Sequence, residues 1–168
     1  DSTGLKLCGP GEWPHEKHGT TTRRSWRRLH IAVDADPGQI AAASLTTSDV
    51  GEASQVGPLL HQLGGLVASF TADGAYDQDS VYREIAAGHP EGSVIVAPRS
   101  SAVPGDAAQT APTMHDRHLQ ITTEHGHMAW QKAAGYNWRA LVAADISRSE
   151  RVIGDGLRFR TDRRQATE

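Results

Sequence analysis

The sequence predicts an α/β fold in which an antiparallel hairpin is followed by parallel strands, with helices flanking one mixed sheet. Residues 24–34 alternate in the manner of a strand, and Ala35-Asp36-Pro37-Gly38 is a strong turn signal that sends the chain back. Two apolar runs, residues 66–71 and 93–97, are separated by a helical pattern over residues 78–87. Strand, helix and strand in that order indicate a parallel β-α-β unit.

The first half of the chain supplies the antiparallel part. Residues 1–8 are expected to be the end of a strand whose first half is missing, and Gly9-Pro10-Gly11 breaks it. The returning strand of the hairpin is expected over residues 39–45. Residues 53–63 then predict an amphipathic helix that ends at Gly64-Gly65.

The second half supplies the parallel strands and the remaining helices. Residues 98–113 are rich in Pro, Ala, Ser and Gly and predict a loop, and residues 115–152 predict helix with a break near Ala134-Gly135. Three antiparallel strands followed by two parallel strands with crossover helices is the order of a ribonuclease-H-like sheet. We expect one domain over residues 1–160 and a polar tail over residues 161–168.

Length and composition exclude several classes of protein. A chain of 168 residues has the size of one globular domain. No apolar stretch approaches the roughly 18–20 residues of a membrane span, and the polar start shows no signal-peptide pattern. The single Cys8 excludes an internal disulfide framework and a multi-cysteine zinc site, so a cytoplasmic setting is expected. The start at Asp1 suggests the C-terminal part of a longer protein, or a processed product.

The net charge of −3 conceals an uneven distribution. Residues 1–30 and the last thirty residues are basic, whereas the middle is acidic. Such a pattern fits a protein that binds phosphates at its periphery and holds metal-binding carboxylates in its centre. The alternative is a solvated surface with scattered arginines.

Six short stretches, taken in order, resemble the catalytic core of a DDE transposase of the IS5 insertion-sequence family. The resemblance covers residues 1 to about 158. The stretches are Asp1-Ser2-Thr3-Gly4-Leu5-Lys6, Gly11-Glu12-Trp13 with Lys17-His18-Gly19, Trp26 to Asp34, Leu45-Thr46-Thr47, Asp73-Gly74-Ala75-Tyr76-Asp77, and Gly135-Tyr136 with Arg139.

The resemblance implies a ribonuclease-H-like fold and a two-metal site whose ligands include Asp1 and Asp73. The family pattern places a Glu four residues after the Arg of its Tyr-x-x-Arg element, and a Lys seven residues further on. Here these positions hold Ala143 and Glu150, so both family residues are absent. Asp145 is the nearest acid, but two residues along a helix is about 200° of rotation, so it should point away from the face of position 143.

Phosphodiester cleavage explains why such a site needs carboxylates. Negative charge develops on the scissile phosphate and on the leaving 3′ oxygen, and two Mg²⁺ (or Mn²⁺) ions stabilise it. Mg²⁺ prefers oxygen ligands and keeps several waters. With the third acid missing, we expect catalysis to be severely impaired. For Asp73 the alternative is a turn residue, because Asp-Gly is a common turn pair.

The resemblance also suggests residues that contact DNA. Arg139 is expected on a phosphate near the site, with Tyr136 on the same helix face, although the two are also spaced as an ordinary packing pair. A basic patch is expected at Lys17, Arg23, Arg24, Arg27 and Arg28, with a solvated strand edge as the alternative.

These inferences predict the catalytic domain of a transposase that cleaves and joins DNA with divalent metal. Its partner is double-stranded DNA bearing terminal inverted repeats, and we also expect self-association but no membrane. The alternatives are a non-catalytic DNA-binding remnant of the same fold and a nuclease unrelated to transposition. His115, His118, His125 and His127 form no convincing zinc array and are expected at the surface, whereas His30 is expected to pack.

Overall fold

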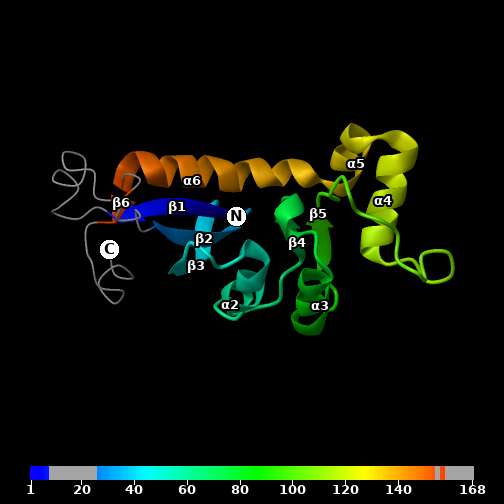
Figure 1. Cartoon of the computed structure of the whole chain (residues 1–168), viewed down its shortest axis with the longest axis horizontal. Coiled ribbons are helices and arrows are strands. Elements are labelled where there is room, and N and C mark those ends of the chain that lie inside the picture. The colour runs from blue at the N-terminus through cyan, green and yellow to red at the C-terminus, as the bar shows by residue number, and fades with distance from the viewer. Residues whose placement is uncertain (8–25, 154–155, 158–168) are drawn as a thin grey trace, which may run out of the picture.

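A computed structural model describes residues 1–7, 26–153 and 156–157, and their strands fall into two sheets. The larger sheet has the order β3-β2-β1-β6 and the smaller one pairs β4 with β5. The long helix α6 runs along one side of the larger sheet and reaches the helices at the far end of the molecule (Figure 1). The strands of the larger sheet are β1 (Ser2–Leu7), β2 (Trp26–Asp34), β3 (Gln39–Thr47) and β6 (Gly156–Leu157).

The larger sheet is built around an antiparallel ladder. β1 pairs with β2 from Ser2 opposite His30 onwards, and β2 pairs with β3 across the predicted turn. The register shifts between Ala32 and Val33, which marks a bulge. β6 adds a short parallel pairing with β1 that the sequence pattern did not predict.

The segment after β3 forms a short helix. A 3-10 turn η1 (Glu52–Gln55) leads into α2 (Val56–Leu60), and hydrogen bonds of Gln62 and Leu63 to residues three positions earlier continue the coil as tight turns. Pro58 is tolerated because it lies in the first turn, where its missing N–H has no helical partner to lose. The predicted helix over residues 53–63 is therefore confirmed in place but is shorter.

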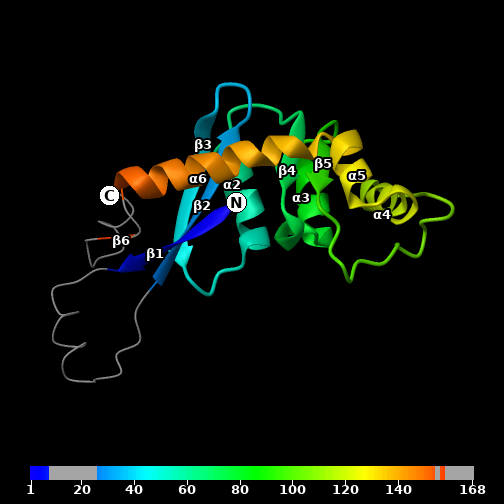
Figure 2. The same ribbon diagram turned by 90° about the horizontal axis from the view of Figure 1, so that it is seen from above.

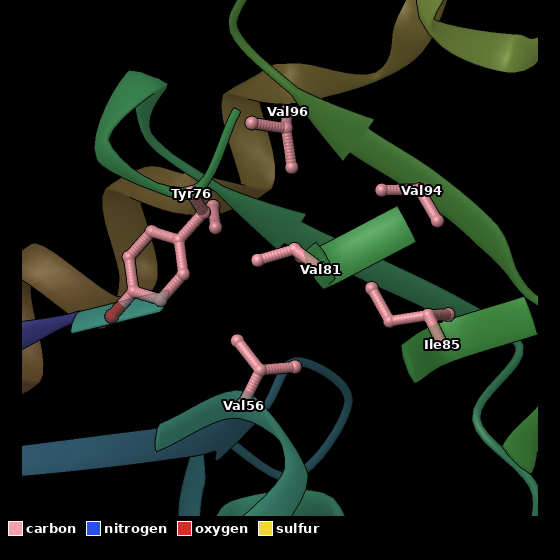
Figure 3. Packing of buried hydrophobic residues seen from close by; sticks show 7 residues of the cluster. Val56, Tyr76, Val81, Ile85, Val94 and Val96 are labelled. Atoms are coloured by element: carbon pink, nitrogen blue, oxygen red, sulfur yellow. The ribbon is translucent and has the colours of Figure 1, made fainter. Parts of the chain in front are cut away.

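The main apolar core lies between α2, the smaller sheet and α3. The chain runs through β4 (Ser69–Ala72), the 3-10 turn η2 (Gly74–Tyr76), α3 (Asp79–Gly88) and β5 (Ser93–Val96). Figure 3 shows the buried side chains converging from these elements and from α2. They are Val56, Ala72, Tyr76, Val81, Ile85, Val94 and Val96.

The last part of the described chain is helical. It comprises α4 (Met114–His125), α5 (His127–Ala134), the 3-10 turn η3 (Tyr136–Trp138) and α6 (Arg139–Ile153). Gly135, with φ of 73°, ends α5 in the left-handed conformation, which glycine adopts without the steric cost of a side chain. Figure 2 shows α4 and α5 at one end of the molecule and α6 crossing over β1 and β2.

The predicted α/β class with a mixed sheet and flanking helices is confirmed, and two details differ. The strands form two sheets instead of one, and β4 begins at Ser69 and not at Leu66, whose side chain is 82% exposed. An apolar run forms a strand only where a neighbouring strand pairs with it. In the described residues β4 pairs with β5 alone, and its other edge has no strand partner. A second helix break, at Gly126, was not predicted.

None of the described helices combines the length and apolar character needed to cross a membrane.

Candidate active site

Two carboxylates that are 72 positions apart in sequence meet at one guanidinium group. Arg139 Nη2 lies 3.1 Å from Asp1 Oδ2 and 3.0 Å from Asp73 Oδ2. Asp1 precedes β1, Asp73 follows β4, and Arg139 begins α6. The three side chains are 19%, 31% and 30% exposed respectively, so the site is open to solvent without being on a flat surface.

Asp73 serves both as a turn residue and as part of the site. Its Oδ1 accepts a 2.9 Å hydrogen bond from the backbone N–H of Ala75 and caps η2, which is the turn role weighed above. Its Oδ2 faces Arg139. One oxygen therefore fixes the orientation of the carboxylate, while the other remains available for a cation.

Asp1 is held in the same manner. Its Oδ1 accepts a 2.9 Å bond from the N–H of Ser2, and its backbone oxygen accepts one from Ile31. The α-amino group donates to the carbonyl oxygen of Ile31 at 3.1 Å, and burial lowers the pKa of this amino group, an effect that the carboxylates of Glu52 and Asp73 oppose.

Glu52 and Tyr76 lie beside the two aspartates and were not identified from the sequence. Glu52 in η1 accepts a 2.6 Å hydrogen bond from Ser2 Oγ. The Tyr76 hydroxyl is buried without a hydrogen-bond partner, and burial, together with the negative charges of Glu52 and Asp73, raises its pKa. No local sequence pattern identifies Glu52 as a site residue. An acid at the start of a helix is common, and only the contact with Ser2 of β1 distinguishes this one.

The Gly-Tyr-x-x-Arg element has a structural explanation. Gly135 provides the left-handed turn, and the ring of Tyr136 then packs 5.0 Å, centroid to centroid, from the buried ring of Trp130. Burial raises the pKa of Tyr136. The turn delivers Arg139 to the carboxylates, and its buried Nε has no hydrogen-bond partner.

The positions expected to hold the further family residues lie on α6. Ala143 is exposed and lies one helical turn after Arg139. Residues four apart lie on the same face of a helix, so a longer side chain at position 143 would extend from the face that carries Arg139. Asp145 is buried and its Oδ1 lies 2.6 Å from Arg148 Nη1, so the two positions differ in environment. The side chain of Glu150 lies outside the described part.

The predicted basic patch is described only in part. Lys17, Arg23 and Arg24 lie outside the described residues. Arg27 and Arg28 are adjacent in β2, and neighbouring residues of a strand direct their side chains to opposite faces. Arg28 Nη1 donates to the carbonyl oxygen of Val50 at 3.0 Å. β2 is an inner strand of the sheet, so this pair does not form the strand edge that was weighed as the alternative.

The oxygens of Asp1 and Asp73 fit a hard divalent cation such as Mg²⁺. Carboxylate oxygens are its preferred ligands, and it retains waters where the protein offers few groups. Within residues 1–7, 26–153 and 156–157, no group of three or more His, Cys, Asp or Glu residues is arranged to hold a metal ion. The site therefore offers a cation two carboxylates, and among the described residues no third acid is arranged beside them to bind it.

The histidines are placed differently from the prediction in one case. His118 is buried beside Trp130, with 5.5 Å between ring centroids, and was expected at the surface. His118 lies on the side of α4 that packs against α5, and Trp130 of α5 covers it there. His30 is fully buried and its Nε2 lies 2.9 Å from Thr46 Oγ1, as expected for a packing residue.

Comparison with known proteins identifies the family of the chain. The family model described as "Transposase DDE domain" matches residues 1–167, which is nearly the whole chain. No solved structure matches.

Proposed function

Because the chain belongs to the transposase DDE domain family, we propose that it is the catalytic domain of an IS5-like transposase, which cleaves and joins DNA strands with Mg²⁺ or Mn²⁺. The observation that carries the proposal is the convergence of Asp1 and Asp73 on Arg139. A turn-forming Asp needs no carboxylate partner from another sheet, whereas a phosphoryl-transfer site needs such a pair.

In this proposal each residue has a separate role. Asp1 and Asp73 present one oxygen each, and backbone N–H groups hold the other oxygen of each carboxylate in place. A divalent ion held by these oxygens supplies Lewis acidity at the scissile phosphate. The unpartnered hydroxyl of Tyr76 is a donor available to a water or a substrate oxygen beside them.

Arg139 has two roles that exclude each other at the same nitrogen. Bonded to Asp1 and Asp73, its Nη2 neutralises the carboxylates in place of a metal. Bonded to DNA, its planar fork binds a phosphate in a bidentate manner. The substrate in this proposal is double-stranded DNA with terminal inverted repeats, which the protein binds as a multimer in the bacterial cytoplasm. Arg27, Arg28, Lys17, Arg23 and Arg24 are proposed to add phosphate contacts.

The absence of a third acid favours a second candidate function. Ala143 cannot bind metal, and no third ligand completes a site in the described part of the chain. These are the features expected of a transposase remnant that still binds DNA but no longer cleaves it. This is the second candidate function. A ribonuclease-H-like nuclease unrelated to transposition would share the fold, and a preference for paired transposon ends over arbitrary DNA separates it from a transposase.

Replacing Ala143 with Glu tests the proposal. We expect Ala143→Glu to raise Mn²⁺-dependent nicking of supercoiled plasmid DNA by about 100-fold, since a missing electrostatic contact at a transition state costs that order of rate. Ala143→Gln has the same length without the charge and should remain at the level of the parent chain. Adding Asp73→Asn to Ala143→Glu should abolish the gain.

One outcome would contradict the cleavage proposal. If Ala143→Glu is folded, as a cooperative unfolding transition would show, but nicks DNA no faster than Ala143→Gln, the cleavage proposal is wrong for this protein. Fluorescence anisotropy with labelled duplex DNA then separates the remaining possibilities, because a binding remnant retains salt-dependent affinity and a chain without DNA function does not.

A further inference from the structure

Arg99, which follows shortly after β5, holds the turn that comes directly after Asp73. Its Nε donates a 2.7 Å hydrogen bond to the carbonyl oxygen of Gly74, and its Nη2 donates one of 2.8 Å to the carbonyl oxygen of Ala75. The two donors lie on one edge of the planar guanidinium, so together they fix the plane of that group relative to η2. An exposed arginine thus makes two directed, charge-assisted bonds to the residues that follow Asp73.

The two carbonyls belong to the peptide units that bind Asp73. The amide of Ala75, in the first unit, donates to Asp73 Oδ1 at 2.9 Å. The amide of Tyr76, in the second unit, donates to the backbone oxygen of Asp73 at 3.1 Å. A trans peptide unit is planar, and its N–H and C=O point in opposite directions. Each unit is therefore held by Arg99 at its oxygen and by Asp73 at its nitrogen.

These bonds link Arg99 to the carboxylate of Asp73 and reinforce one another. A cation that binds the carbonyl oxygen of a peptide unit polarises the unit and makes its N–H a stronger donor. The bond from the Ala75 amide to Asp73 Oδ1 is thereby strengthened, and rotation of the carboxylate about χ1 is restricted. With Oδ1 held in this way, Oδ2 is directed to Arg139, whose Nη2 lies 3.0 Å away.

The backbone of Arg99 is anchored at the other end of the same turn. Its N–H donates to Asp77 Oδ2 at 2.9 Å, and Asp77 directly follows η2. The turn also approaches the segment after β5 closely, because a Cβ at Gly74 would lie 3.3 Å from the carbonyl oxygen of Ala97. At Tyr76 the turn is buried in the main core (Figure 3). Arg99 therefore spans η2 from a fixed base, and its guanidinium holds both peptide units from there.

A second explanation of these bonds needs no link to the site. Basic side chains often bind the carbonyls at the end of a helix, and Arg99 would then only stabilise η2. The two explanations differ at Asp73. A stabilising contact alone changes how readily the protein unfolds, whereas a positioning contact also changes which rotamer the Asp73 side chain adopts in the folded protein.

We propose that Arg99 is a positioning residue for Asp73. Its guanidinium acts through the two peptide units between Asp73 and Tyr76, and keeps the Asp73 carboxylate in the rotamer that directs Oδ2 towards Arg139. That Oδ2 then serves a metal ion rests on the proposed function, whereas the orientation of the side chain does not. Loss of Arg99 should therefore release the Asp73 carboxylate while the fold is retained.

NMR measures the rotamer of Asp73 without DNA or metal. Couplings from the Asp73 Cγ to its backbone nitrogen and carbonyl carbon give the populations about χ1. We expect the ratio of the main rotamer to the others to fall at least about fivefold in Arg99→Gln, the order expected when hydrogen bonds from a charged group are lost. Arg83→Gln is the matched control, since the exposed Arg83 also donates to a backbone carbonyl, that of Asp79, which lies outside η2. Asp116, held by its own capping box, is the internal reference.

Equal Asp73 couplings in Arg99→Gln and Arg83→Gln overturn the inference. This holds even if Arg99→Gln is the less stable protein, because Arg99 then only stabilises η2. Arg99→Lys keeps the charge and covers the case in which Arg99→Gln does not fold. It should lower the same rotamer ratio by a smaller factor, since an ammonium group is a point charge on a flexible stem, and unchanged couplings there likewise overturn the inference.

Mn²⁺ binding tests separately the part that rests on the proposed function. Arg139→Gln, which frees both carboxylates, is compared by calorimetry with Arg139→Gln combined with Arg99→Gln. The second protein should bind Mn²⁺ more weakly, by the factor by which the population of the main Asp73 rotamer falls. If neither protein binds Mn²⁺, the metal site of the proposed function is wrong, whereas a changed Asp73 rotamer in Arg99→Gln still supports the positioning role. Equal affinities despite a changed rotamer would show that Arg99 does not position Asp73 for a metal ion.

Discussion

Asp73 and Asp77 lie four residues apart in one stretch of sequence and have opposite environments. Asp77 is buried and fully engaged: its Oδ1 lies 3.2 Å from both the Tyr82 hydroxyl and His115 Nε2, and its Oδ2 accepts a 2.9 Å bond from the N–H of Arg99. Asp73 is about one-third exposed, and beyond its capping bond its carboxylate pairs with Arg139. The same residue type thus joins the segment after β5 to α3 and α4 at one position and faces an open site at the other.

The difference shows how to separate a structural carboxylate from a functional one. A carboxylate whose oxygens are all satisfied by rigid neighbours contributes to folding and has nothing left for a ligand. A carboxylate that shares a partly exposed guanidinium with a second carboxylate can exchange that partner for a ligand. By this criterion Asp77 holds the scaffold together, and Asp73 belongs to the site.

The largest effect should come from removing Asp77. Asp77→Ala leaves the Arg99 N–H and the Tyr82 hydroxyl without their partner, so we expect a loss of about 3 kcal/mol in the free energy of unfolding, measured in urea. Asp73→Ala, which loses one capping bond, should cost about 1 kcal/mol or less. Asp77→Asn keeps the size and should fall between them. Equal losses at the two positions would remove the distinction.

A smaller effect is expected from removing the positive charge of Arg139. Arg139→Gln eliminates the group that competes for Asp1 and Asp73, so Mn²⁺ affinity, measured by titration calorimetry at low salt, should rise at least about tenfold. Arg148→Gln makes the same charge change at an exposed arginine paired with Asp145, and is the matched control. Identical affinities in the two variants would show that Arg139 does not compete with metal.

The smallest effect concerns acid stability at a third aspartate. Asp116 and Thr113 form a capping box at the start of α4, and hydrogen bonds from the Thr113 side chain and the Gly105 N–H lower the pKa of Asp116 to about 2. Because the folded-state pKa lies below the usual 3.8, its contribution is present above about pH 4 and is lost as the pH falls towards 2. Asp116→Asn should therefore flatten the pH dependence of the unfolding midpoint in that range. An unchanged slope would assign acid sensitivity to other groups.

Local patterns in the sequence determined most of the secondary structure. The alternation in residues 24–34, the turn at residues 35–38 and the two separated apolar runs predicted the hairpin and the β-α-β unit. Each of these signals depends only on neighbours along the chain. The same holds for the break at Gly135, where a left-handed residue is needed. Asp1, Asp73 and Arg139 were instead selected as site residues through the resemblance to a transposase family, because a local pattern alone marks Asp73 only as a turn residue.

Only the tertiary structure decided how these residues meet. The sequence assigned Arg139 to a DNA phosphate, and its bonds to both carboxylates depend on the start of α6 lying beside the end of β4. Glu52 enters the site because η1 packs against η2, which follows Asp73, and because Glu52 accepts a hydrogen bond from Ser2 Oγ; no local signal predicts either contact. The division into two sheets has the same origin: a strand is defined by its neighbours in space, and on one side of β4 the described chain provides none.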